Sequence, residues 1–310
     1  GEGAHMHEGG GHGGMMSVLA GIDRMEAVPL NTPEGAALLS HHDTLSHPYF
    51  EGGLGQHFVT QSVGGYCGPA SMTMVLNGLN AEAPSSVLFS PYLYFTQQNL
   101  WNKCMDDITP IEGIFQTEAW GLGLTLQQLS QLLECHVKTD YKNGDTLAAP
   151  PPPKGDAADA DPAAALRTIL KREMATPGHA LIANFHRSSL GLGYGGGGHH
   201  SPLGAYSPEK DMVLIMDVAR YKYPPIWVPT EALQAAMDTK DECGEITNAP
   251  DAAERTRPRE QKISDQRMAE MLRIGLKEEL LLTEWLFPQC KPAQRGIVLA
   301  CTETSAPCVL

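Results

Sequence analysis

The sequence lacks any uninterrupted apolar run of the ~18 residues that a transmembrane helix needs, so we do not expect it to span a membrane. It also lacks a block of Lys and Arg, and its formal net charge is -14. Nucleic acids and anionic membrane surfaces attract clustered basic side chains. Neither is therefore an expected partner.

Cysteine is sparse as well, with seven residues in a chain of 310 and no CxxC pair. A scaffold held together by disulfides would need a denser set in a shorter chain. We therefore expect the cysteines to be mostly reduced. Cys104 and Cys135 in particular are expected to be buried helix residues, which is commoner for a free cysteine than opportunistic binding of soft metal ions.

The first sixteen residues, GEGAHMHEGGGHGGMM, are rich in Gly, His and Met and show no apolar periodicity. Such a composition predicts a flexible leader. His5, His7 and His12 suit weak metal binding, although short His-rich leaders are more often only flexible. A cytoplasmic location is favoured, and a periplasmic one stays open if a signal peptide has been removed ahead of this leader.

Residues 17–310 are expected to form one domain, because 42% of the chain is hydrophobic and no clean boundary interrupts it. Two stretches, near 146–161 and 239–290, are Pro-rich or highly charged and predict surface insertions. Ser264 is expected to begin a helix inside the second one.

Helical patterns come first in this domain and strand patterns follow. The segment YCGPASMTMVLNGLN predicts a buried helix that begins at Cys67. Thr125 predicts the cap of a second helix, and Asp161 with Pro162 the start of a third. The runs ALIANFH, SPLGAY, DMVLIMDVA and IWVP, and GIVLA near the C-terminus, are typical of short antiparallel strands. The predicted fold class is α+β.

Cys67 is the strongest candidate for chemistry. A helix N-terminus carries partial positive charge and free backbone amides, and both favour the nucleophilic thiolate over the thiol. The alternative is a buried core cysteine, but such cysteines rarely start a helix in a YCGPAS context, where Gly68 allows close backbone approach. We interpret Cys67 as a nucleophile.

A thiol nucleophile needs a base, which in Cys/His enzymes lies far along the chain. His199 follows Cys67 by 132 residues and precedes the strand run SPLGAY. Its neighbour His200 is expected to point to the other side of the strand, so only one of the two would face the thiol. A surface histidine is the alternative for either.

The base in turn needs a group that orients it and stabilises its charged form. Asp217, at the end of the apolar run DMVLIMD, is the candidate; a strand-end cap or an ion pair with Arg220 is the alternative. Gln61, six residues before Cys67, is placed like a side-chain donor to an oxyanion, although a loop glutamine alone means little.

Four blocks stand out between about Pro33 and Asp238: TQSVGGYCGPASMTMVLNGL, FSPYLYFTQQNLW, HHSPLGAY and IMDVARYKYPPIWVPTEALQAAMDT. Together they resemble successive blocks of the phytochelatin synthase family, particularly its short bacterial members, and DVARYKYPP is very specific. The resemblance implies a papain-like fold with the nucleophile at a helix N-terminus, packed on an antiparallel sheet.

The resemblance also implies roles for individual residues. The HxSP pattern of the family places its histidine on His199 and its variable position on His200, while its aspartate and oxyanion glutamine fall on Asp217 and Gln61. The residues matching positions near the substrate are Tyr66, Gly68, Arg187 and Arg220. An arginine there suits the two carboxylates of glutathione. The tetraglycine run 195–198 departs from the family pattern.

The implied activity is that of a glutathione γ-glutamylcysteinyltransferase, which serves heavy-metal detoxification or glutathione turnover. Cys67 would take the γ-Glu-Cys group from glutathione with loss of glycine, and pass it to a second glutathione or to water. The cysteines after residue 240 are scattered, unlike the cysteine-rich C-terminal region of the plant members, so we expect hydrolysis to compete.

No fixed metal site or cofactor is expected. In the family a heavy-metal ion such as Cd, Zn or Cu acts as a glutathione thiolate complex, because soft ions favour sulfur ligands. A homodimer is implied only by the resemblance. Three alternatives stay open: a glutathione hydrolase, a general cysteine peptidase acting on α-linked peptides, and a metal-sequestering protein that relies on the leader and the cysteines.

Overall fold

The computed structural model describes residues 27–86, 89–109, 123–147, 161–192, 198–246 and 290–310. The predicted leader, most of both predicted insertions and the helix expected at Ser264 lie outside these residues. The side chains of 241–246 and 290–292 lie outside them as well.

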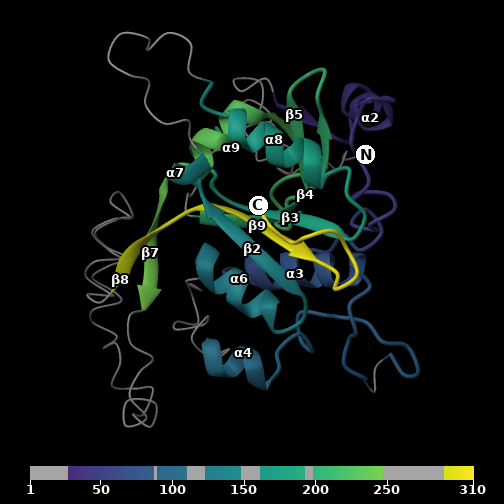
Figure 1. The fold of residues 1–310 in the computed structure, drawn as a ribbon, viewed down its shortest axis with the longest axis vertical. Helices are drawn as coiled ribbons and strands as arrows, with labels where there is room; N and C mark the ends of the chain where they lie inside the picture. The colour runs from purple at the N-terminus through teal and green to yellow at the C-terminus, as the bar shows by residue number, and fades with distance from the viewer. Residues whose placement is uncertain (1–26, 87–88, 110–122, 148–160, 193–197, 247–289) are drawn as a thin grey trace, which may run out of the picture.

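A seven-stranded sheet, antiparallel throughout, forms the centre of the described fold (Figure 1). Its spatial order is β1 (Val28–Pro29), β6 (Ile226–Pro229), β5 (Met212–Ile215), β4 (Gly198–Ser207), β3 (His179–His186), β9 (Gly296–Cys301) and β2 (Lys138–Asn143). The five predicted strand runs are confirmed as β3, β4, β5, β6 and β9.

The sequence did not reveal the edge strands. The segment KTDYKN of β2 has no buried residue, so it lacks the apolar signal of a strand, and β9 supplies its partner. A separate two-stranded sheet pairs β7 (Lys240–Ile246) with β8 (Cys290–Gln294). Because β9 lies between β3 and β2, it joins the edge strand β2 to the rest of the sheet.

Helices cover both faces of the large sheet (Figure 1). One face carries α3 (Cys67–Gly78), α6 (Leu126–Glu134) and, beyond α6, α4 (Lys103–Ile108). The other carries α7 (Gly144–Leu147), α8 (Ala164–Glu173) and α9 (Thr230–Met237), while α2 (Pro33–Ser40) follows β1. The α+β prediction is confirmed, with two apolar cores separated by the sheet.

Two predicted helix starts have different outcomes. Thr125 caps α6 as expected: its side chain accepts a hydrogen bond from the Gln128 amide, and the Gln128 side chain accepts one from the Thr125 amide. The prediction at Asp161 and Pro162 was wrong, because α8 begins at Ala164. Asp161 instead accepts from the Ala163 backbone at 3.0 Å.

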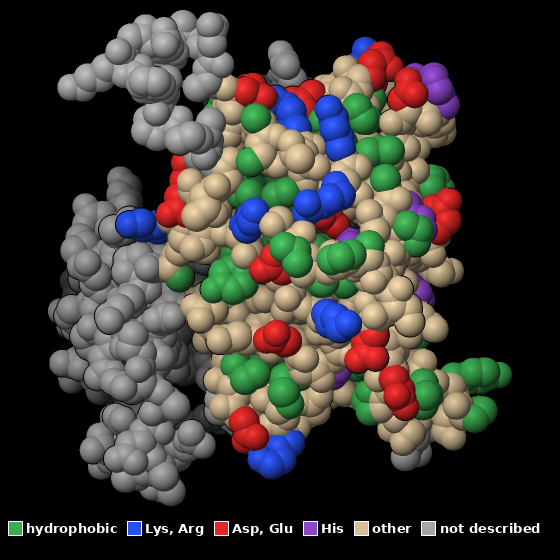
Figure 2. Space-filling model, in the orientation of Figure 1, with side chains coloured by type: hydrophobic (Ala, Val, Ile, Leu, Met, Phe, Trp, Pro, Cys, Tyr) green, Lys and Arg blue, Asp and Glu red, His purple; other side chains and the backbone are tan. Residues whose placement is uncertain are grey.

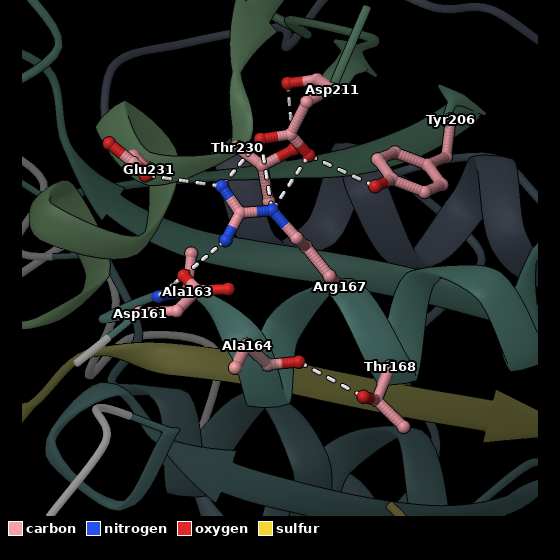
Figure 3. Close-up of polar contacts among 9 residues, drawn as sticks. All are labelled: Asp161, Ala163, Ala164, Arg167, Thr168, Tyr206, Asp211, Thr230 and Glu231. Carbon is pink, nitrogen blue, oxygen red and sulfur yellow. Dashed lines mark hydrogen bonds and ion pairs between the residues drawn. The ribbon is translucent and has the colours of Figure 1, made fainter. Parts of the chain in front are cut away.

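The side chain of Asp161 serves an ion-pair cluster around Arg167 (Figure 3). The Arg167 guanidinium on α8 contacts Asp161, both carboxylate oxygens of Asp211 and, at 3.2 Å, Glu231 on α9. Tyr206 on β4 donates its hydroxyl to Asp211 at 3.0 Å. The cluster therefore joins the β4–β5 turn to α8 and α9.

The expectation of mostly reduced cysteines was wrong for the described side chains. Cys104 on α4 is bonded to Cys135 at the end of α6, and Cys301 on β9 is bonded to Cys308. Cys104 is exposed and Cys135 half-buried, so neither is the buried helix cysteine that was predicted. Neither pair forms a CxxC motif, since the two cysteines are 31 residues apart in the first pair and 7 apart in the second.

We expect the two disulfides to contribute unequally to stability. Removing the first as Cys104→Ala/Cys135→Ala frees a loop of 31 residues and should lower the free energy of unfolding by about 3–4 kcal/mol. Removing the second as Cys301→Ala/Cys308→Ala opens a loop between cysteines only 7 residues apart. This change should lower the free energy of unfolding by about 2 kcal/mol. Urea unfolding of the oxidised proteins measures both, and a larger loss from the short loop would contradict the loop-entropy account.

The outer surface mixes charges of both signs. On the face shown in Figure 2, basic and acidic side chains of the described residues are interspersed among apolar ones. Within the described ranges no helix has the length and apolar character needed to cross a bilayer.

Candidate active site

Cys67 is the first residue of α3, as predicted, and its side chain is 7% exposed. The helix starts without a side-chain cap, so its first amides are not satisfied by a neighbouring hydroxyl or carboxylate. A methyl group on Gly68 would lie 2.7 Å from Cδ1 of Leu124, so a larger residue here requires the Leu124 side chain to shift. The thiol is thus held at the positive end of a buried helix.

His199 and Asp217 meet at the start of β4 and the end of β5. The Nε2 atom of His199 lies 2.9 Å from Oδ1 of Asp217, and both side chains are buried. Since Asp217 occupies Nε2, Nδ1 is the ring nitrogen left for the thiol. The structure therefore brings together the predicted nucleophile, base and orienting carboxylate.

Arg187 completes this buried group from the end of β3. Its Nη2 atom lies 2.8 Å and 2.9 Å from the two carboxylate oxygens of Asp217, and 2.7 Å from Nε2 of His199. A guanidinium nitrogen can only donate, so Arg187 does not accept a hydrogen bond from His199. Both groups instead donate to the Asp217 carboxylate. The Ala219 amide adds a further bond to Oδ1 at 2.7 Å. Asp217 thus balances two cationic partners.

The prediction that His200 points to the other side of the strand from the thiol was wrong. Nδ1 of His200 lies 3.7 Å from Sγ of Cys67. The two residues alternate along β4 as expected: His199 is opposite Phe185 and His200 opposite Asn184. His199 lies at the beginning of the strand beside Asp217, where it also lowers the pKa of the thiol.

The electrostatics of the group favour an ionised thiol. Burial raises the pKa of Cys67, but the interactions of the thiol with His199 and His200 outweigh it, so this pKa lies well below its ordinary value. Burial lowers the pKa of His199, yet Asp217 more than offsets this and the net shift is upward. Burial also opposes ionisation of Asp217, but His199 and Arg187 hold its pKa far below its ordinary value. A thiolate–imidazolium pair is the favoured state.

Gln61 is buried in the loop before α3, and its backbone amide donates to Val218, next to Asp217, at 2.8 Å. Its side-chain Nε2 donates to the Val63 carbonyl at 2.9 Å. The loop carrying the predicted oxyanion donor is therefore anchored beside Asp217, and the donor itself is bonded within its own loop.

The other predicted substrate residues lie around this group. Tyr66 is buried at the N-cap of α3, and burial raises the pKa of its hydroxyl. Arg220 is exposed, and its guanidinium lies 4.5 Å from the centre of the Phe58 ring. Arg187 lies against Asp217, so the arginine with free access to solvent is Arg220 rather than Arg187.

One group of described side chains has the spacing of cation ligands: ligand atoms of His41, His42 and Asp43 lie within 4.8 Å of one another. It follows α2, and its His41 pairs with Glu209 at 3.2 Å.

The sequence did not predict the contact of Arg187 with Asp217, or that of His200 with the thiol. For His200, the alternation of side chains along a strand was the available sequence signal. In the structure, Ser71 on α3 donates its hydroxyl to the His200 carbonyl at 3.1 Å. This contact fixes how α3 sits on β4, and that packing is not visible in a local pattern.

Comparison with known proteins shows which family the chain resembles. A family model described as phytochelatin synthase matches residues 24–247. Glutathione gamma-glutamylcysteinyltransferase 3 of Lotus japonicus is 34% identical over 220 residues, which is 69% of this chain and 40% of that protein. Glutathione gamma-glutamylcysteinyltransferase 1 of Triticum aestivum is 33% identical over 221 residues, 70% of this chain and 38% of that protein.

A fungal relative extends the comparison beyond plants. Glutathione gamma-glutamylcysteinyltransferase of Schizosaccharomyces pombe is 29% identical over 195 residues, 59% of this chain and 38% of that protein. The chain thus spans about two-fifths of the length of the curated relatives that it matches. Because the family model covers well over half of this chain, the protein belongs to the phytochelatin synthase family.

Proposed function

We propose that this chain is a glutathione γ-glutamylcysteinyltransferase that uses Cys67 as its nucleophile. The observation that carries the proposal is a buried thiol at a helix N-terminus beside a buried imidazole–carboxylate pair, in a chain of this family; the pair, His199 with Asp217, helps to hold the thiol pKa below its ordinary value. The same arrangement, a nucleophile helix packed on an antiparallel sheet that carries the base, supports a papain-like fold.

In the first half of the reaction, the thiolate attacks the carbonyl carbon of the Cys-Gly peptide bond of glutathione. The carbon–nitrogen bond breaks, and the departing glycine amine takes the proton held on Nδ1 of His199. The γ-Glu-Cys group is left as a thioester on Cys67. Backbone amides at the start of α3 and the amide of Gln61, once it turns from Val63, are the proposed donors to the oxyanion.

In the second half, the amine of another glutathione or a water molecule attacks the thioester. Its proton passes to His199, and the sulfur leaves as the thiolate. Attack by glutathione gives phytochelatin, and attack by water gives γ-Glu-Cys. The exposed Arg220 and the buried Tyr66 and Gly68 are the proposed substrate contacts, with Arg220 suited to a substrate carboxylate.

Products formed from glutathione test the proposal. We expect incubation with glutathione, with and without Cd²⁺, to release glycine and to leave a γ-Glu-Cys adduct on Cys67, both detectable by mass spectrometry. Longer (γ-Glu-Cys)n-Gly products identify a transferase, whereas γ-Glu-Cys alone identifies a hydrolase. An α-Glu-Cys-Gly peptide is the matched control. Equal cleavage of that peptide would replace the proposal by a general cysteine peptidase.

Metal is proposed to act as a substrate component and not as a resident cofactor. A Cd, Zn or Cu ion bound by two glutathione thiolates would supply an acceptor whose thiols are masked while its amine stays free. Rate enhancement by Cd²⁺ only at concentrations where this complex forms would support that role. A homodimer is proposed on family grounds alone.

The two disulfides are informative about the cellular compartment in which the protein works. Such bonds persist in oxidising compartments and are rare in the reducing cytosol. They favour the periplasmic alternative over the cytoplasmic one.

A further inference from the structure

A second imidazole contacts the nucleophile. His200 lies on the face of the sheet that packs against α3, where its carbonyl accepts from Ser71 and its Nδ1 lies 3.7 Å from Sγ of Cys67. The ring of His199 instead packs against Phe185, with 5.6 Å between the ring centres. The two rings therefore lie on different sides of β4, and the contact with the sulfur is made by His200.

The surroundings of the two rings differ. His199 is paired with Asp217, but His200 has no carboxylate partner among the described residues. His200 is 2% exposed, and its Nε2 is buried without a hydrogen-bond partner in the described part of the chain. Its one described side-chain polar contact is with the thiol.

Charge balance indicates which form of His200 fits this place. The thiolate and Asp217 carry two negative charges, and the His199 imidazolium and Arg187 carry two positive ones. A further buried positive charge on His200 would have no carboxylate to offset it. A neutral ring that keeps its proton on Nδ1 donates to the sulfur and adds no charge.

We propose that His200 is a further catalytic residue: it donates a hydrogen bond from Nδ1 to the Cys67 sulfur without transferring its proton, while His199 carries out proton transfer. This inference rests on the proposed function for its consequence in turnover. When the acceptor amine attacks the thioester, His199 is occupied by the incoming proton. At that moment the carbon–sulfur bond breaks, and the His200 donor stabilises the charge that returns to sulfur.

Two amide variants distinguish this role from simple packing. The side-chain nitrogen of His200→Asn can occupy the position of Nδ1 and donate to sulfur, whereas that of His200→Gln lies near the position of Nε2 and leaves the sulfur without this donor. Both replace a buried ring by a neutral amide. They therefore place similar demands on folding, which thermal unfolding of both proteins verifies.

The first readout is the rate of Cys67 alkylation by iodoacetamide as a function of pH, with the labelled cysteine identified by mass spectrometry. We expect the midpoint of His200→Gln to rise by about one pH unit, since a lost donor disfavours the thiolate, and that of His200→Asn to stay near the native value. Equal midpoints in the native protein and His200→Gln, or equally raised midpoints in both variants, would overturn the proposal.

The second readout is turnover of glutathione. We expect His200→Gln to accumulate the γ-Glu-Cys adduct on Cys67 and to lose roughly 10²-fold in the rate of its breakdown, comparable to removing one oxyanion donor. Unchanged breakdown of the adduct would overturn the leaving-group role. Alkylation needs no substrate, so a midpoint shift without any reaction of glutathione would contradict the proposed function and leave the donor to sulfur standing.

Discussion

Cys67→Ser is expected to reduce glycine release from glutathione by about 10⁴-fold or more, to the background rate. The serine hydroxyl fits the same position at the start of α3, but His199 cannot ionise it as it does a thiol. Glycine release followed by mass spectrometry measures the loss. No γ-Glu-Cys adduct should form on residue 67.

The control for this variant is its stability. Cys67 takes no part in a disulfide, so the midpoint of thermal unfolding should stay close to that of the native protein. Glycine release that survives in a folded Cys67→Ser protein would refute covalent catalysis at this residue. Stoichiometric metal binding with no turnover in either protein would favour the metal-sequestering alternative.

Asp217→Asn is expected to lower both activity and stability. The amide no longer stabilises the His199 imidazolium, which should cost about 10²–10⁴-fold in turnover. It also leaves the buried Arg187 guanidinium without its anionic partner, which should lower the free energy of unfolding by about 3–5 kcal/mol at neutral pH. Steady-state kinetics and urea unfolding measure the two losses.

A double variant separates the loss of activity from the loss of stability. Asp217→Asn/Arg187→Gln removes the unpaired charge, so it should recover a large part of the stability without recovering activity. Failure to recover stability would show that Arg187 is not the source of the loss. Recovery of activity would show that Asp217 acts only by balancing Arg187.

The pH dependence of this stability loss has a definite sign. The pKa of Asp217 is lower in the folded than in the unfolded chain. Its stabilisation is therefore complete above the ordinary carboxyl pKa of about 4 and is lost as the pH falls toward the folded value. The stability gap between native protein and Asp217→Asn should narrow in acid, and a gap independent of pH would contradict the ion-pair account.

The sequence by itself determined the local elements of the site. Small residues and a proline after Cys67 specify a helix start there, and the apolar runs around His199 and Asp217 specify strands. The strand β2 escaped prediction because its polar residues lie at an edge of the sheet. Helix-start and strand patterns can be recognised from sequence because each depends on the residues of one helix or strand, through their conformational propensity and the spacing of apolar side chains.

Only the tertiary structure decided which of these groups touch. The contacts of His200 with Cys67 and of Arg187 with Asp217 join elements that are far apart in the chain. The Cys104–Cys135 disulfide likewise depends on how α4 packs against α6. Each depends on the way in which helices settle on a twisted sheet, because packing of the whole core fixes side-chain distances that no local pattern encodes.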